Sequence, residues 1–297
     1  MTQMLFWAVA RLLTVGMALG ESVEHLRRAS AGDPITIADY PYAVILVGTL
    51  DLDGVTHARH CSASIVAPHW LLTAAHCLYD QNDEGYRMDT FEAIVNSSIR
   101  AGAKGSQEVY GAQTFIAPGF DININKSRGD IALIKLKEPI VLGDNGGPPS
   151  AITLPKPAGW LRKSAVRHHI VKWTDYVTLD GPPGPTEGKL RQFDAFPTAD
   201  ESCIAEYPGI DPVSQYCLKA TDRYGVVCRG HAGGASATYV SRGGRSFWVQ
   251  LGVTINRDCP WGNRAPNSPL LTDVSQYCDF IEKTTGQELC VDVPELK

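Results

Sequence analysis

The glycine-rich stretch at residues 228–235 is the part of the sequence best suited to chemistry. It reads Cys-Arg-Gly-His-Ala-Gly-Gly-Ala, with three glycines in five positions. That composition predicts a tight turn whose backbone takes conformations closed to residues with a Cβ. Successive amides of such a turn can point at one spot and hold an oxyanion. His76 and Asp130 supply two further groups that acyl transfer uses, a general base and a carboxylate that orients it.

The sequence contexts of these residues resemble those of the trypsin/chymotrypsin-like serine proteases. His76 follows Leu-Thr-Ala-Ala and precedes a cysteine, and Asp130 lies in Gly-Asp-Ile-Ala-Leu-Ile. In that family a Cys-x-Gly-Asp-Ser-Gly-Gly-Pro turn carries the nucleophilic serine, and the three segments occur here in the family's order. The resemblance implies that His76 and Asp130 are two members of a catalytic triad. It also implies two six-stranded antiparallel β-barrels with a C-terminal α-helix and a site in the cleft between them.

The glycine-rich turn departs from the family pattern at the nucleophile itself. Ala232 stands at the serine position, His231 replaces the preceding aspartate, and Ala235 replaces the closing proline. A methyl group cannot attack a carbonyl, and deleting the nucleophile from such a unit costs about 10⁶ in turnover. Ser236 lies four residues further on, where we expect the next strand, out of reach of His76.

Two interpretations of His76 and Asp130 follow. In a site without a nucleophile, a histidine hydrogen-bonded to a buried aspartate is a satisfied polar pair, and losing one partner would leave the other desolvated. The alternative is that the pair itself performs catalytic chemistry. Gly230 and Ala232 could still present backbone amides to a bound carbonyl, as a remnant of the oxyanion hole. Peptide binding without cleavage is therefore physically possible.

Short apolar or alternating runs, separated by Gly, Pro, Asn and Asp, dominate the chain from residue 43 onward. Runs rich in Val, Ile, Thr and Trp at this spacing predict an all-β barrel or sandwich. The predicted strands cover residues 43–47, 64–66, 70–73, 91–95, 131–136, 170–173 and 247–253. Residues 274–283 have the apolar rhythm of a helix that ends before Gly286. Residues 51–54 are predicted to form a hairpin turn, because they lack the further ligands of a calcium loop.

Composition narrows the class of protein. A chain of 297 residues that is 44% hydrophobic and 20% charged supports one large or two small globular domains. The net charge of −5, with no basic cluster longer than residues 26–28, argues against a nucleic-acid partner. No cofactor or metal is expected.

The N-terminal residues predict a secretory signal. Residues 4–19 are apolar and end at a small-x-small site, so residues 1–20 are interpreted as a cleaved signal peptide. Arg11 interrupts the apolar run, and the first residues carry no Lys or Arg. A membrane anchor is the alternative, and it fits less well because the run is short and contains a charge.

Residues 21–28 are interpreted as a short propeptide ahead of a protease-like domain at residues 29–284. By resemblance, Arg28 and Ala29 form the activation junction, where the family usually has Arg before Ile-Val-Gly-Gly. In the family the freed amino group pairs with the aspartate that His231 replaces here. Burying an ammonium without its counter-charge costs several kcal/mol, so this switch is not expected to close in the usual way. The alternative is that residues 27–28 are a basic surface pair.

The eight cysteines indicate a disulfide framework and an oxidising compartment, because their number is even and no Cys-x-x-Cys pair occurs. The family resemblance pairs Cys61 with Cys77, Cys203 with Cys217, and Cys228 with Cys259. Cys278 and Cys290 remain, most simply as a fourth bridge that ties the tail, residues 285–297, to the final helix. Sequence alone does not determine the connectivity, since eight cysteines allow about 105 pairings.

The specificity pocket is placed by resemblance alone. Val226 occupies the position at which trypsins carry the aspartate that binds Lys or Arg. Thr254 and Asn256 fall in the segment that is usually Ser-Trp-Gly. Without a charged base, the pocket is not expected to select basic side chains.

Other motifs carry weaker signals. Asn96 and Asn125 begin N-glycosylation tripeptides, which fit secretion but also occur by chance. His168 and His169 could suggest a metal, but adjacent residues of a strand point to opposite faces and no further ligand set accompanies them. Two unconnected histidines are the preferred interpretation.

Two functions are consistent with this sequence. The first is a secreted serine protease homologue without peptidase activity, which binds an extracellular protein or peptide, such as an active protease or a protease inhibitor. The second is a serine-type endopeptidase whose activity survives through another nucleophile. Neither involves nucleic acid or a membrane.

Overall fold

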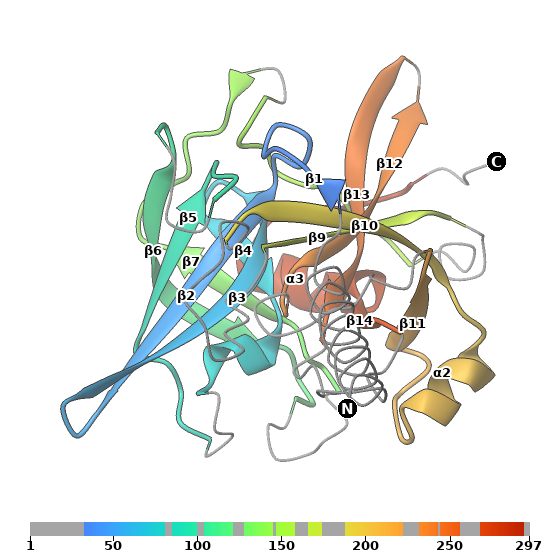
Figure 1. Ribbon diagram of the computed structural model, residues 1–297, viewed down its shortest axis with the longest axis horizontal. Helices are drawn as coiled ribbons and strands as arrows, with labels where there is room; N and C mark the ends of the chain where they lie inside the picture. The colour runs from blue at the N-terminus through green and yellow to red at the C-terminus, as the bar shows by residue number, and fades with distance from the viewer. Residues whose placement is uncertain are drawn as a thin grey trace, which may run out of the picture.

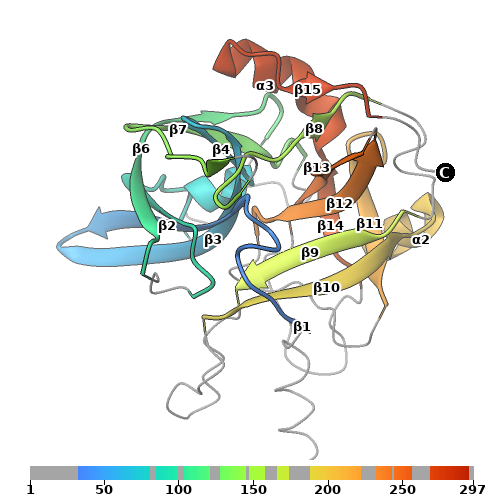
Figure 2. The same ribbon diagram turned by 90° about the horizontal axis from the view of Figure 1, so that it is seen from above.

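The computed structural model describes residues 33–80, 85–99, 104–120, 128–144, 147–157, 166–173, 188–221, 232–242, 244–255 and 268–293. Within this part of the chain the strands form two closed rings that lie side by side (Figures 1 and 2). The predicted pair of six-stranded antiparallel barrels is confirmed. The protein is mostly β, as the spacing of its apolar runs predicts.

The first barrel closes in the order β2-β3-β4-β7-β6-β5, because β2 pairs with both β3 and β5. Its strands are β2 (Ala43–Leu52), β3 (Val55–Ala67), β4 (Trp70–Thr73), β5 (Thr90–Val95), β6 (Gln107–Ile116) and β7 (Ala132–Leu136). Large side chains such as Ile65, Leu71 and Leu133 are fully buried inside it. Burying aliphatic side chains of this size stabilises the fold by about 1.5–3 kcal/mol each.

A tight hairpin joins β2 to β3 and confirms the turn predicted at residues 51–54. Asp53 and Gly54 form its tip with φ of 53° and 79°. Two central residues with positive φ match the right-handed twist of the flanking strands. The Asp51 carboxylate accepts a hydrogen bond from the Gly54 amide at 3.0 Å, so its role is to hold the turn. The hairpin projects beyond the barrel at the lower left of Figure 1.

The second barrel closes in the order β9-β10-β11-β14-β13-β12, since β9 pairs with both β10 and β12. Its strands are β9 (His168–Trp173), β10 (Leu190–Pro197), β11 (Gln215–Ala220), β12 (Ala235–Arg242), β13 (Arg245–Thr254) and β14 (Leu270–Asp273). A short strand, β1 (Asp33–Pro34), pairs with β10. Helix α2 (Asp200–Glu206) is tied to β11 by the Cys203–Cys217 disulfide.

The predicted final helix is present with one change at its start. Its first turn, η3 (Val274–Tyr277), is a 3₁₀ helix, and α3 (Cys278–Thr285) follows it. The Asp273 carboxylate caps the 3₁₀ turn by accepting the Ser275 amide at 3.0 Å, which satisfies one of its orphan donors. The helix ends at Gly286, in the left-handed conformation with φ of 70°, as the sequence predicts.

The chain beyond α3 packs against the rest of the protein. The Cys278–Cys290 disulfide holds β15 (Cys290–Val291) beside β8 (Leu154–Pro155), with which it pairs in parallel (Figure 2). Val293 then joins a buried apolar cluster with Val240 and Val249 of the β12–β13 hairpin. The tail therefore contributes to the core.

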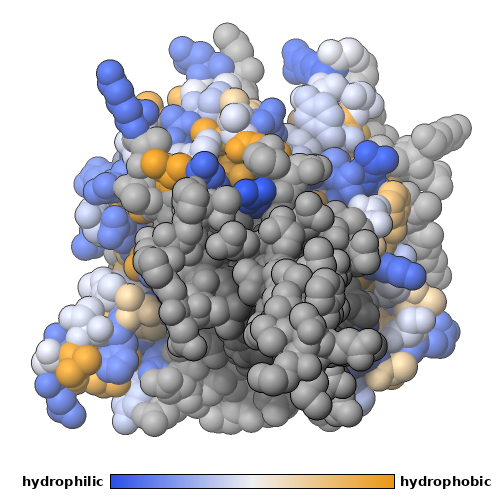
Figure 3. All heavy atoms as spheres, in the orientation of Figure 1, coloured by the Kyte–Doolittle hydropathy of each residue, from blue (hydrophilic) through white to orange (hydrophobic). Residues whose placement is uncertain are grey.

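The surface in Figure 3 carries hydrophobic residues in small groups among hydrophilic ones, as far as the described residues show. Scattered apolar residues of this kind are normal on a protein surface. Among the described residues no helix is long and apolar enough to cross a membrane.

Candidate functional site

The first barrel brings His76 and Asp130 together. His76 lies in η1 (Ala75–Leu78), directly after β4, and Asp130 lies just before β7. Because β4 and β7 are antiparallel neighbours that pair Thr73 with Ala132, the end of one strand meets the start of the other. The sequence separation of 54 residues between the two side chains is thus closed by one strand pair.

The carboxylate of Asp130 holds the histidine at two points. Its Oδ2 lies 2.6 Å from His76 Nδ1, and its Oδ1 accepts the His76 backbone amide at 2.8 Å. Both side chains are fully buried. A carboxylate at Nδ1 selects the tautomer with the proton on Nδ1, so that Nε2 carries the lone pair. This is the orientation that a general base needs.

The second barrel supports this pair through a hydroxyl group that the sequence did not reveal. Thr272 of β14 donates its Oγ1 hydrogen to the backbone carbonyl of Asp130 at 3.0 Å. Thr272 is fully buried in β14, between Leu271 and Asp273. No local motif marks this threonine in the sequence.

Ala232 is anchored to the first barrel by its main chain. Its carbonyl accepts a hydrogen bond from the Ser62 amide of β3 at 2.8 Å, and 4% of Ala232 is exposed. The next residue, Gly233, donates its amide to the Thr254 carbonyl at 2.9 Å and has φ of 81°. A Cβ on Gly233 would overlap Thr73 Oγ1 and the Ser62 carbonyl. Glycine is therefore required here both by conformation and by close approach.

Thr254 braces the same turn, and its place in a specificity pocket stays a prediction. Its amide and its Oγ1 both donate to the Gly234 carbonyl, at 3.0 and 3.2 Å, and its side chain is fully buried. Of the sequence-predicted site residues, several lie outside the described residues. They are Arg28, Ala29, Asn125, Val226, Cys228, Gly230, His231, Asn256 and Cys259.

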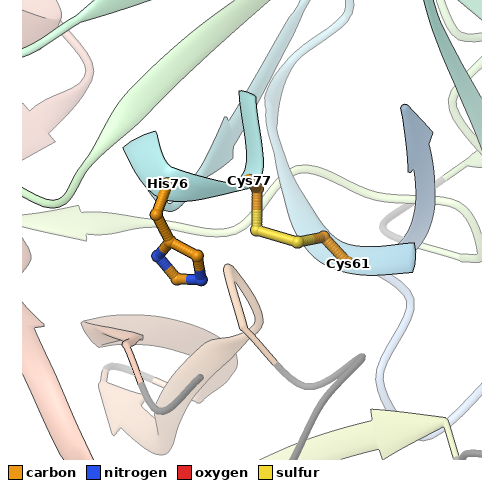
Figure 4. Close-up of side chains that lie close together, drawn as sticks. All are labelled: Cys61, His76 and Cys77. Atoms are coloured by element: carbon orange, nitrogen blue, oxygen red, sulfur yellow. A yellow bond between two sulfur atoms is a disulfide. The ribbon is translucent and has the colours of Figure 1, made fainter. Parts of the chain in front are cut away.

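Figure 4 shows the surroundings of His76. The Cys61–Cys77 disulfide, with an S–S distance of 2.00 Å, lies beside the His76 imidazole. The ligand atoms of Cys61, His76 and Cys77 all lie within 4.8 Å of one another, a spacing that metal sites also show. Sulfurs bonded to each other offer no thiolate, which is the form that binds zinc, so this group does not form a metal site.

Ser236 lies in β12 and engages a different histidine. Its Oγ is 2.9 Å from His168 Nδ1, and both side chains are fully buried. The neighbouring His169 is partly exposed and lies 3.1 Å from Gln192 and 3.0 Å from Asp194. The two adjacent histidines therefore face opposite sides of β9 and have separate partners, which the alternation of a strand predicts.

The buried His168 is expected to make the protein less stable in acid. Burial, with a smaller effect from the charge of His169, lowers the pKa of His168 to about 3 from 6.5. The unfolded chain therefore takes up a proton first as the pH falls. We expect the free energy of unfolding to be unaffected by this group above pH 6.5 and to fall by about 1.4 kcal/mol per pH unit from there toward pH 3.

Denaturant unfolding of the wild-type protein and of His168→Gln between pH 7 and pH 4.5 measures this effect. For His168→Gln, the free energy of unfolding should depend less steeply on pH, by the effect of about one proton. His169→Gln, at the partly exposed neighbour, should keep the wild-type slope. Parallel curves for wild type and His168→Gln would contradict the assignment.

Asn96, one of the two predicted glycosylation positions, directly follows β5. It has φ of 59°, and its side-chain amide donates to the Gly105 carbonyl at 3.2 Å. The third residue of its tripeptide, Ser98, accepts the Ile37 amide at 2.8 Å. The tripeptide thus joins β5 to the N-terminal segment, and its glycosylation stays a prediction.

Comparisons with known proteins agree with this architecture. Proproteinase E of Bos taurus is 28% identical over 238 residues, which cover 78% of this chain and 85% of the bovine protein. Chymotrypsin-like elastase family member 3B of Homo sapiens is 27% identical over 228 residues, or 75% and 77% of the two chains. Complement C1s-1 subcomponent of Mus musculus is 28% identical over 276 residues, which cover 87% of this chain and 35% of the mouse protein.

A solved structure of an HL collagenase superposes on this chain with a TM-score of 0.64 and 22% identity, and the match covers 86% of this chain and 98% of the collagenase chain. At this identity the likeness shows the fold alone. A family model described as Trypsin matches residues 31–281, which span the strands of both barrels from β1 to β14. The chain with its buried His76–Asp130 pair belongs to the trypsin family of serine proteases.

Proposed function

We propose that this protein is a secreted serine protease homologue that binds an extracellular protein or peptide without cleaving it. The observation that carries the proposal is the methyl side chain of Ala232, which stands where the family has its nucleophilic hydroxyl. An acyl-enzyme needs an oxygen or sulfur at this position, and carbon supplies neither. The nearest hydroxyl downstream, on Ser236, is buried against His168.

Secretion is supported by the cysteine chemistry. Three disulfides are present among the described residues, at Cys61–Cys77, Cys203–Cys217 and Cys278–Cys290. Disulfides of this kind persist in oxidising, extracellular environments. The apolar N-terminal run supports the same compartment.

The His76–Asp130 pair has a structural role in this proposal. An aspartate that is fully buried and bonded to both the backbone and the ring of one residue fixes η1 against β7. Truncating one partner would leave the other buried and unpaired, which costs about 3–5 kcal/mol. The pair can therefore persist in a protein that does no chemistry.

The preserved geometry of that pair also supports the second candidate, a serine-type endopeptidase that uses another nucleophile. A fluorophosphonate probe separates the two functions because it labels activated serine nucleophiles covalently. Mature protein, cut after Arg28, is expected to show no label by intact mass, while an active elastase treated in parallel is labelled fully. One probe mass per chain, mapped to the inter-barrel cleft, would reject the proposal.

Partners are expected among extracellular proteases and their inhibitors, because a protease-like surface without turnover can still be recognised by proteins that bind proteases. The wild-type protein and an unrelated disulfide-bonded control protein are each immobilised and incubated with the native extracellular fluid. The wild-type protein should capture a discrete set of proteins that the control does not capture. Capture of the same proteins by both would contradict specific binding.

A further inference from the structure

An open pocket of about 360 Å³ lies at the junction of the two barrels, on the side of the Asp130 segment that leads into β7. Its volume falls within the range of small-molecule and side-chain binding sites. Residues 118–119 and 128–129, between β6 and β7, line one side, and residues 211, 213–214 and 276–277 of the second barrel line the other. None of these residues belongs to the nucleophile turn or to the specificity pocket.

Asp211 places a fixed carboxylate in this pocket. Its Oδ1 accepts the Val213 amide at 3.1 Å, and its Oδ2 accepts the Ser214 hydroxyl at 2.9 Å. The side chain is 22% exposed, so it is held by its own turn but still reaches the pocket. A preorganised acceptor of this kind loses little side-chain entropy when a ligand binds.

Arg128 neutralises the negative charge of the Asp211 carboxylate only weakly. Its Nε lies 3.6 Å from Asp211 Oδ2, beyond hydrogen-bond distance, and its side chain is 67% exposed. Exposed ion pairs of this geometry contribute about 0–1 kcal/mol. A ligand could therefore displace the guanidinium at little cost.

Tyr277 gives the pocket an aromatic wall in a negative electrostatic environment. Its hydroxyl is hydrogen-bonded to the Ser214 side chain and the Gly129 backbone. Burial raises the pKa of Tyr277; the hydrogen bonds with Ser214 and Gly129 oppose this rise, and the carboxylates of Asp211 and Asp130 add to it. Among the described residues, the carboxylates of Asp211 and Asp130 act on this wall against the one exposed guanidinium of Arg128, so the local field favours a cation. The ring face of a tyrosine attracts cations as well.

We propose that this pocket binds a lysine or arginine side chain of an extracellular partner protein, with Asp211 as the charge acceptor and Tyr277 as the aromatic wall. The bound cation takes the place of Arg128 beside Asp211. The protein's net charge of −5 favours a basic partner at long range. The inference goes beyond the proposed function, because it uses no residue of the nucleophile turn and holds whether or not the cleft cleaves peptides.

Four fluorescent peptides test this inference. Each is a Gly-Ser dodecapeptide with a central Leu-x-Leu, where x is arginine, lysine, citrulline or glutamate. Fluorescence anisotropy against the full-length protein at 50 mM salt is expected to show saturable binding of the arginine and lysine peptides. The citrulline peptide, which keeps the shape of arginine without its charge, should bind at least tenfold more weakly. The glutamate peptide should bind no better than citrulline.

Three variants assign the binding to this pocket. Asp211→Asn keeps one acceptor oxygen for the turn and is expected to weaken binding of the arginine peptide about tenfold. Asp194→Asn is the matched control, since Asp194 is also 22% exposed and pairs with an exposed arginine, Arg167, at 3.4 Å. It should change binding less than twofold. Arg128→Ala removes the internal competitor and should tighten binding about threefold.

The Arg128 variant makes the test decisive. A merely structural role for the Arg128–Asp211 pair predicts weaker binding after either substitution, and an anion site predicts weaker binding after Arg128→Ala and a preference for the glutamate peptide. Either result would overturn the proposal, as would equal effects of Asp194→Asn and Asp211→Asn or no saturable binding of the basic peptides. Fluorophosphonate labelling reports separately on the cleft, so failure of one proposal leaves the other measurable.

Discussion

Ala232→Ser alone is expected to restore little peptidase activity. The substitution returns a hydroxyl to a main-chain frame that is already anchored by the Ser62 amide and the Thr254 carbonyl. The resemblance to trypsins, however, assigns a second defect to the chain, because His231 stands where the family has the carboxylate that receives the new N-terminal amino group. An ammonium without that partner costs several kcal/mol to bury, so the oxyanion hole is not expected to form.

The triple variant Ala232→Ser, His231→Asp, Ala29→Ile, cut after Arg28, should therefore exceed the single variant by at least about 10²-fold in kcat/KM. This ratio corresponds to about 2.7 kcal/mol of activation free energy. Turnover of elastase-type and chymotrypsin-type peptide amides, with active-site titration to count competent molecules, gives the measurement. Adding His76→Ala to the triple variant is the control that should abolish the gain. Equal recovery by the single and triple variants would show that the activation pair does not limit the site.

Gly233→Ala is expected to have the largest effect on stability. Gly233 has φ of 81°, and a Cβ there would overlap the Thr73 hydroxyl and the Ser62 carbonyl. Gly244, at the tip of the β12–β13 hairpin, has φ of 78° and open space around the same Cβ position. The alanine variant at position 244 thus measures the conformational cost alone, about 1–2 kcal/mol.

The difference between the two variants isolates the docking of the turn onto the first barrel. We expect Gly233→Ala to lower the free energy of unfolding by at least about 3 kcal/mol more than Gly244→Ala, since one of the two overlapping atoms is backbone and cannot rotate away. For a chain of this size that difference lowers Tm by roughly 6–12 °C. Thermal unfolding followed by circular dichroism measures the Tm of each variant. Equal Tm values would show that the turn at Gly233 is not packed against β3 and β4.

All seven predicted runs fall on strands, but the sequence analysis missed β10, β11, β12 and β14, although β14 is buried at all four of its residues. β4 was predicted at its observed bounds, because all four of its residues are apolar or buried threonine. β6 (Gln107–Ile116) was missed, since only Val109 of its ten residues is buried and its polar residues follow no period of two. Its place is set by pairing with β5 on one side and β7 on the other. These pairings depend on the closure of the barrel and leave no local pattern in the sequence of β6.

The sequence likewise identifies some residues of the candidate site and not others. His76 and Asp130 are recognisable because each lies in a distinctive local segment, and the structure places them in direct contact. Thr272 is not recognisable, because its hydroxyl acts on a carbonyl 142 positions earlier in the chain. The pocket at Asp211 and Tyr277 also depends on four separate segments, none of which carries a motif.

The bonds that hold Ala232 and Gly233 in place all come from peptide groups, to Ser62 and Thr254. No side-chain atom at position 232 takes part in them. Main-chain atoms therefore hold the fold at this position, whereas reactivity would depend on the side chain. A lineage can replace one hydroxyl by hydrogen here without disturbing the packing of the turn.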